Sequence, residues 1–170
     1  MFLEFWELQN MGFDIKLGID SYFNERANKE GKQVIGLESQ LFHTELLAGL
    51  TKDEAEALLN NVLKNLGKFR ANVEKISTAW QAGEMTVVAD YINREIGDHP
   101  TLIHRLLVER NKNWVPQIEA LAKGDKDAIV TVGAGHLAGK QSLVELLEKN
   151  GWKVTQQVML PNEERAKPAL

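Results

Sequence analysis

The chain has 170 residues, 44% of them hydrophobic and 26% charged, with a formal net charge of -4 and an isoelectric point near 5.6. This composition is typical of a globular protein with one sizeable core, so we expect a single domain over residues 1–170. The acidic balance argues against a general nucleic-acid-binding protein, because neutralising phosphates requires a clustered surplus of Lys and Arg, and the absence of cysteine excludes disulfides and thiolate chemistry.

Neither a membrane span nor an export signal is predicted for the chain as given. No apolar run reaches the roughly 18 residues that a spanning helix needs. The first three residues are followed at once by Glu4 and Glu7, which does not fit a basic-then-apolar leader. We therefore expect a protein of the cytoplasm, or of the periplasm if a leader has been removed.

The beginning of the chain predicts two helices and a short strand. Residues 2–8 are so rich in large apolar side chains that a helix there would be apolar on most of its circumference and would need cover on several sides. A helical stripe that starts at Ile19 ends near Gly31. Residues 32–37 then read as a strand, with Glu38 just past its end.

Residues 39–123 show helical periodicity and no strand pattern. Thr51 and Glu54 form a capping box that opens one of these helices. In the last long helix, Pro116 predicts a kink or a break near Asn113, because proline in a helix interior removes a backbone hydrogen bond.

Residues 128–160 predict a strand, a helix and a second strand. The first strand, residues 128–132, is a β-branched run that stops at Gly133-Ala134-Gly135. Ser142 is an N-cap candidate for the helix, and residues 153–159 form the second strand. Such a βαβ unit has parallel strands, and it places His136 at the carboxyl end of a strand, where open α/β sheets hold their ligands.

The fold class that follows is α/β. We expect a small, at least partly parallel sheet with a C-terminal βαβ unit and a large helical insertion. Residues 161–170, with charges and two prolines, look like a loose tail.

Several stretches together resemble one protein family. The segment VGAGHLAGKQSLVELLEKNGWKV resembles the closing motif of TraB/GumN proteins, the group that also includes the TIKI metalloproteases. The segment LGIDSYFNERANKEGKQVIGLES resembles the family's helix and strand before a Gly-Leu-Glu motif. The segment LTKDEAEALL resembles the next helix, and the segment VERNKNWVPQIEALAKG resembles the Arg-Asn helix. The resemblance covers roughly residues 12–158 and corresponds to the C-terminal half to two-thirds of a TraB/GumN domain.

The resemblance implies a metal-dependent hydrolase with a peptidase-like site. The family uses two G-x-x-H motifs and a glutamate. The second motif matches Gly133-Ala134-Gly135-His136 and the glutamate matches Glu38, whereas the first motif lies upstream of the chain as given. His136 and Glu38 would then be the catalytic residues and the ligands of a divalent ion (Mn, Co or Zn), whose bound water attacks a carbonyl.

The same pocket would be lined by further residues of the motifs. Arg110 and Asn111 match the Arg-Asn helix and would point at the pocket, together with Gly133 and Gly135 of the G-x-x-H turn. A peptide and a small molecule both stay open as the ligand. A phosphate-binding interpretation of the glycines lacks both the G-x-G-x-x-G pattern and the P-loop lysine.

A second hypothesis is a catalytically silent, shortened family member that acts as a dimeric binding or assembly module. Two ligands are fewer than the three protein ligands usual for a catalytic zinc. His136 would then be a capping residue and Glu38 a carboxylate at a helix N-terminus, and Arg110 and Asn111 would form an ordinary ion pair and hydrogen bond. The remaining histidines match no motif and are expected at the surface or in turns: His43, His99 and His104.

We also expect a homodimer. A domain without the family's first strands would expose a sheet edge and apolar surface, and both favour association. Closed two-fold dimers are the commonest solution, with Phe2, Phe5 and Trp6 at the contact. One version of this dimer brings two copies of His136 together across the axis to form a shared metal site.

Overall fold

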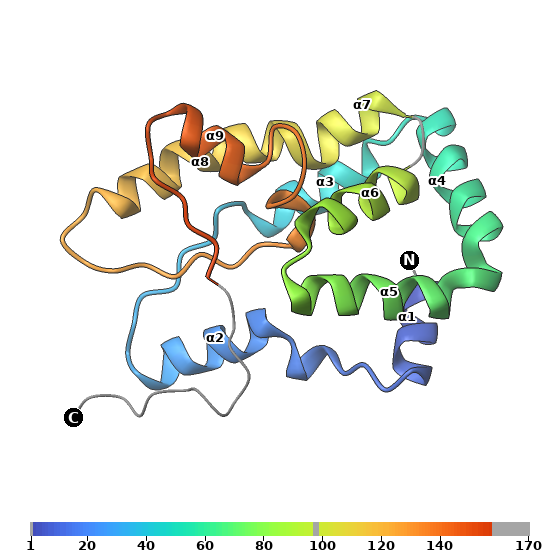
Figure 1. Cartoon of the computed structure of the whole chain (residues 1–170), viewed down its shortest axis with the longest axis horizontal. Helices are drawn as coiled ribbons and strands as arrows, with labels where there is room; N and C mark the ends of the chain where they lie inside the picture. Colours follow the sequence, from blue (N-terminus) through green and yellow to red (C-terminus); the bar gives the residue numbers. More distant parts are fainter. Residues whose placement is uncertain (1, 97–98, 158–170) are drawn as a thin grey trace.

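The computed structural model describes residues 2–96 and 99–157 (Figure 1). The helical elements in chain order are α1 (Phe2–Asn10), η1 (Ile15–Leu17), α2 (Ile19–Lys29), α3 (Gln40–Ala48), α4 (Lys52–Asn65), η2 (Leu66–Lys68), α5 (Phe69–Ala82), α6 (Met85–Ile96), α7 (Pro100–Ile103), η3 (His104–Val108), α8 (Glu109–Ala122), η4 (Ala134–His136) and α9 (Leu143–Lys149).

The predicted α/β fold is wrong for this part of the chain, which is all-α. Residues 32–36, 127–133 and 152–157 are irregular, and no strand is present in the described ranges. The predicted strands, sheet and βαβ unit are therefore absent there. Val158 and Met159 of the third predicted strand, and the predicted tail, lie outside the described residues.

The physical reason is that a strand needs a partner. β-propensity expresses how well a side chain fits a half-buried pleated surface rather than an intrinsic backbone preference. Here no backbone hydrogen bond joins the three irregular segments to one another among the described residues. Val34, Ile35 and Ile129 are 54%, 58% and 71% exposed, so their β-branched side chains lie on no buried face.

The helices predicted from local signals are confirmed. Thr51 Oγ1 accepts a hydrogen bond from the Glu54 backbone N–H at 3.2 Å, and Glu54 Oε2 accepts one from the Thr51 N–H at 2.8 Å, which completes the predicted capping box of α4. Ser142 caps α9 as predicted. None of the described helices has the length and apolar character needed to cross a membrane.

The break predicted near Asn113 is also absent. Helix α8 continues through Pro116 to Ala122. The irregularity lies upstream, where His104–Val108 forms a π-helix between α7 and α8. A π-turn inserts one extra residue into a helix and often marks a functional site.

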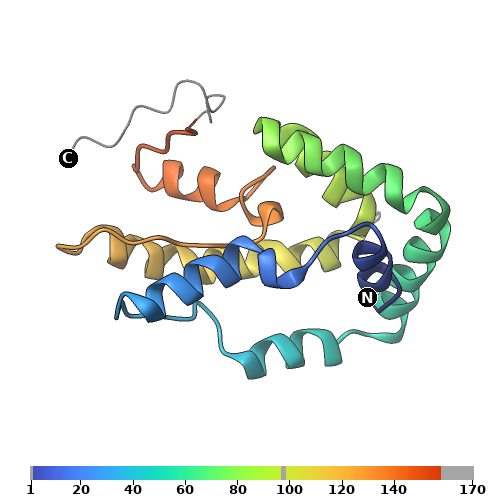
Figure 2. The ribbon, with the colours of Figure 1, turned by 90° about the horizontal axis from the view of Figure 1, so that it is seen from below.

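The core beside the candidate site lies between α8 and α9. Trp114, Val115 and Leu143 form its buried centre. Both views show α9 against α8, and Figure 2 shows the chain after α8 running back alongside that helix toward η4. This path brings residues 133–136 back to the first turn of α8, where the Arg-Asn motif is located.

Candidate functional site

The four polar residues singled out by the motifs lie in one connected cluster. Glu38 precedes α3, Arg110 and Asn111 are on α8, and His136 ends η4. Arg110 bonds to Glu38, Asn111 bonds to His136, and the Trp114 ring contacts both Arg110 and His136. Three segments that are far apart in sequence therefore meet at the amino-terminal half of α8.

Glu38 and Arg110 form a two-pronged ion pair. Arg110 Nε donates to Glu38 Oε1 at 3.0 Å and Arg110 Nη2 donates to Oε2 at 2.9 Å. The two side chains are only 8% and 14% exposed. A third donor group, Arg110 Nη1, bonds to the Leu106 carbonyl at 3.1 Å, which ties the guanidinium to its own helix. Planar bidentate pairs of this kind are among the stronger ion pairs in proteins.

His43 is a further member that the motifs did not predict. Its Nε2 lies 3.0 Å from Glu38 Oε2, and its side chain is 58% exposed at the rim of the cluster. The expectation of a surface histidine is confirmed, since the His43 side chain is exposed. The sequence feature that could have identified His43 is its position in the first turns of a helix. That helix is capped by Ser39, the residue that follows Glu38.

Trp114 connects the two halves of the cluster. The Arg110 Cζ atom lies 4.8 Å from the centre of the Trp114 ring, which is a cation–π contact. On the other side, the Trp114 and His136 ring centres are 4.4 Å apart. The Trp114 Nε1 donor is buried without an acceptor among the described residues. No sequence motif singled out Trp114, although its spacing of four from Arg110 is that of side chains that meet on a helix.

The Asn111 amide determines the tautomer of His136. Asn111 Nδ2 donates to the Gln141 carbonyl at 2.9 Å, so the amide oxygen must face the other way. That oxygen lies 2.7 Å from His136 Nδ1. Because a carbonyl oxygen can only accept, the Nδ1 atom carries the proton and Nε2 keeps its lone pair.

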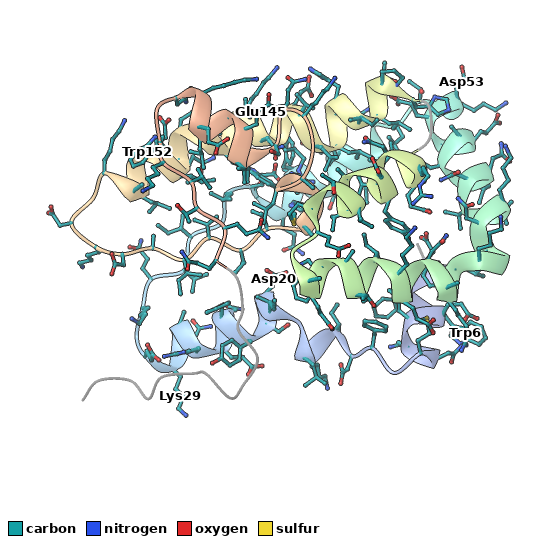
Figure 3. The ribbon with its side chains drawn as sticks, in the orientation of Figure 1. Trp6, Asp20, Lys29, Asp53, Glu145 and Trp152 are labelled. Atoms are coloured by element: carbon teal, nitrogen blue, oxygen red, sulfur yellow. The ribbon has the colours of Figure 1, made fainter. Side chains whose placement is uncertain are left out.

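The turn that follows η4 is tied to α9 and supplies the carbonyl that orients Asn111. Gln141 has a positive φ of 55°. Its backbone N–H donates to the Glu145 carboxylate on α9, which is labelled in Figure 3. The Ser142 hydroxyl accepts from the Glu145 N–H at 3.3 Å, so the start of α9 and the Gln141 carbonyl are held together.

His136 is neutral at neutral pH. Burial and, to a lesser degree, the Arg110 cation lower the pKa of its imidazole, the Glu38 charge opposes them, and the resulting pKa is about 4 instead of 6.5. Only 6% of the residue is exposed. A neutral imidazole with a free Nε2 lone pair can accept a hydrogen bond or bind a metal.

Of the two motif glycines, Gly135 is the more closely packed, and a side chain there would require Ile92 to shift. A Cβ there would lie 2.7 Å from Ile92 Cδ1 of α6, closer than carbon atoms approach. At Gly133 a Cβ would meet only His136 Cδ2, at the ordinary distance of 3.8 Å. Gly135 therefore permits η4 to approach α6. Ligand binding by either glycine stays a prediction.

The donor set fits a divalent ion only in part. His136 has the orientation typical of a metal ligand, with Nδ1 held by a second residue. Glu38, in contrast, has both oxygens bound to a guanidinium whose positive charge would repel a cation. No group of three or more His, Asp or Glu side chains suited to a metal occurs among residues 2–96 and 99–157. As arranged here, the cluster does not fit a catalytic ion by itself.

Comparison with known proteins supports the motif resemblance. A family model described as the TraB/PrgY/gumN family matches residues 1–156, which is most of the chain. Neither a curated protein nor a solved structure matches. The matched range confirms the family prediction and extends it to the first residues, whereas the closer likeness to TIKI proteins and the restriction to a C-terminal part stay predictions.

Proposed function

The chain belongs to the TraB/PrgY/gumN family, and on this premise we propose that it is a catalytically silent member that acts as a dimeric binding or assembly module. In this proposal the cluster around Glu38 and His136 holds α3, α8 and η4 together. Function then resides in the surface that this framework presents.

The observation that carries the proposal is the engagement of Glu38. A metalloprotease-like reaction needs a carboxylate that is free to bind the ion or to take a proton from water. In this chain Arg110 occupies both oxygens of Glu38, and His43 also contacts Oε2. Releasing Glu38 would leave a buried guanidinium without its counter-ion, which costs several kcal/mol in typical buried pairs.

The surface of α1 supports the binding role. Leu3, Phe5 and Trp6 are 48%, 42% and 59% exposed. Figure 3 shows Trp6 on the outer side of α1. Glu7 is the side chain that faces the rest of the chain, where it pairs with Arg70 of α5 at 3.1 Å. A helix that directs a carboxylate inward and large apolar side chains outward is typical of an interface.

A second copy of the chain is the partner that we propose for this surface, because closed two-fold dimers are the commonest assemblies of soluble proteins. The expectation of a sheet edge at the contact no longer contributes, since the described residues form no sheet. The dimer proposal therefore depends on the exposed apolar side chains alone.

A divalent-metal-dependent, peptidase-like hydrolase is the second candidate. The specific observation in its favour is the neutral, oriented His136, whose Nε2 lone pair is free of the Asn111 contact. A bound Mn, Co or Zn ion would supply an activated water. For this candidate to hold, Glu38 must be released from Arg110 or replaced by other ligands.

Calorimetric titration with Mn²⁺, Co²⁺ and Zn²⁺ separates the two candidates. The silent member binds no ion in a His136-dependent manner, so wild type and His136→Ala should give the same titrations. His104→Ala is the matched control, because His104 is 51% exposed and contacts only Glu109 across 3.3 Å among the described residues. Saturable binding that is lost in His136→Ala and in Glu38→Gln, but retained in His104→Ala, would establish the hydrolase-type site instead.

A further inference from the structure

A cavity that is open to solvent lies between α4 and α6, on residues that the motifs did not single out. It has a volume of about 580 Å³ and is lined by Ala57, Asn60, Asn61, Lys64, Asn93, Arg94 and His99. The four residues from α4 have the spacing of one helix face. The cavity volume is in the range of small-molecule sites.

The charge of this cavity is opposite to that of the whole chain. Lys64 and Arg94 are cationic, and none of the described residues that line the cavity is acidic. Neither cation lies in a salt bridge with a described residue, although the Arg94 charge interacts with the neighbouring Glu95 carboxyl. Arg94 uses Nε on the Asp90 backbone carbonyl of its own helix at 3.2 Å. Its two terminal nitrogens remain as donors, in a protein with a formal net charge of -4.

Asn61, which lines the cavity, connects α4 to α6 through side-chain hydrogen bonds. Its side-chain amide donates to the Arg94 carbonyl at 3.1 Å and to the Glu95 carbonyl, and its oxygen accepts from Asn65 Nδ2 at 3.2 Å. These bonds satisfy carbonyls at the carboxyl end of α6, whose partial negative charge would otherwise disfavour an anion. Two of the carbonyls in the last turn of α6 are therefore already hydrogen-bonded.

The partial negative charge at the carboxyl end of a helix would explain the position of either cation taken by itself, since each is in the last turn of its helix. It does not account for their gathering at one cavity with the amides of Asn60 and Asn93 and the His99 imidazole. Amide and imidazole side chains supply neutral hydrogen-bond donors and acceptors. Cations beside neutral polar side chains are the combination that recognises a polar molecule carrying an anionic group.

We propose that this cavity binds a small phosphorylated molecule, with a phosphomonoester group between Lys64 and Arg94 and a hydroxyl-bearing body against Asn60 and Asn93. Arginine and lysine are the usual partners of phosphate oxygens. The cavity is larger than a phosphate ion, which leaves room for the body. This site is separate from the Glu38–His136 cluster and does not depend on the function proposed for it.

Isothermal titration of the full chain at low ionic strength tests the proposal, with ribose 5-phosphate, ribose and inorganic phosphate as probes. Ribose 5-phosphate should bind saturably and ribose should not. Because hydrogen bonds from charged donors to phosphate are stronger than neutral ones, Lys64→Gln and Arg94→Gln should each weaken the binding by about tenfold or more. Lys52→Gln is the matched control, since Lys52 is on the same helix but pairs with Glu56 outside the cavity.

The outcomes separate clearly when circular dichroism shows that each variant retains its helices. Saturable binding of ribose 5-phosphate that Lys64→Gln and Arg94→Gln weaken, and Lys52→Gln does not, supports the site. Inorganic phosphate that competes for it would show that the anionic group is recognised. No saturable binding by the wild-type chain, equal binding of ribose, or equal effects of Lys52→Gln and Lys64→Gln would overturn the proposal.

Discussion

Glu38 and Arg110, 72 positions apart in the sequence, are joined by a bidentate ion pair in which Arg110 Nη2 lies 2.9 Å from Glu38 Oε2. The pair links the loop before α3 to α8, and the same guanidinium lies over the Trp114 ring. One interaction therefore joins two distant segments and engages both oxygens of the Glu38 carboxylate.

Replacing Arg110 by leucine should destabilise the fold. The Glu38 carboxylate, which is 8% exposed, would lose its guanidinium partner and keep the contact with His43, and breaking one side of a buried pair typically costs about 3–5 kcal/mol. We expect a loss of roughly 3 kcal/mol in the free energy of unfolding by urea. Arg26→Leu, which breaks the exposed pair with Glu30, should have little effect.

The double variant Glu38→Leu/Arg110→Leu should recover most of that loss, because it leaves neither charge unpaired. If Arg110→Leu proved no more harmful than Arg26→Leu, the pair would not be the link between α3 and α8 that we describe.

Stability should fall as the solution is acidified from neutral pH, in part through His136. Its pKa is about 4 in the folded chain, compared with the ordinary histidine value of 6.5. Between these values the unfolded chain binds a proton that the folded chain does not, so the stability present above the unfolded pKa is lost as pH falls toward the folded pKa. From about pH 7.5 to about pH 5 the loss should be on the order of 1–2 kcal/mol, with solvent screening allowed for.

Urea unfolding of wild type and His136→Asn at the two pH values isolates this contribution, because other titrating groups are common to both proteins. The variant should show the smaller acid-induced loss. An equal loss in both would mean that His136 is protonated in the folded chain.

The His136 ring should carry its proton on Nδ1. Long-range ¹H–¹⁵N spectra distinguish the two tautomers, and the wild-type protein should show protonated Nδ1 and unprotonated Nε2 at neutral pH, since Asn111 Oδ1 accepts from Nδ1. Asn111→Asp places a carboxylate on the same N–H and should raise the His136 pKa by about one unit or more.

Asn111→Ala removes the acceptor, so the tautomer preference should weaken in that variant. An Nε2-protonated ring in the wild-type protein would contradict the orientation that we assign to Asn111, whose amide is set by the Gln141 carbonyl.

The chain should be a dimer in solution, with α1 in the contact. Trp6 is 59% exposed, and replacing it by glutamate puts a charge into an apolar interface. Light scattering at micromolar concentration should give a dimer mass for wild type and a monomer mass for Trp6→Glu.

Ile129→Glu is the matched control for this experiment, because Ile129 is equally apolar and 71% exposed but lies in the segment after α8, away from α1 (Figure 1). It should remain dimeric. A monomeric wild-type chain under these conditions would remove the proposed assembly.

Much of the candidate site could be predicted from the sequence. Glu38, Arg110, Asn111 and His136 were singled out by motif residues, and the structure brings all four into one cluster. The helices and their caps could also be predicted, because capping depends on residues three positions apart, as with Thr51 and Glu54. Signals of this kind act within one turn of the chain and do not need a distant partner.

Only the tertiary structure decided the features that depend on partners distant in the sequence. Residues 32–37 and 128–132 have the composition of strands, but a strand is stabilised by the neighbour that completes its hydrogen bonds, and in the described residues these segments have none. The partners of Glu38, the placement of Trp114 between Arg110 and His136, and the tautomer of His136 likewise depend on contacts between α8 and segments dozens of residues away. A local sequence pattern carries no information about such contacts, because their energy belongs to pairs of side chains and not to either residue alone.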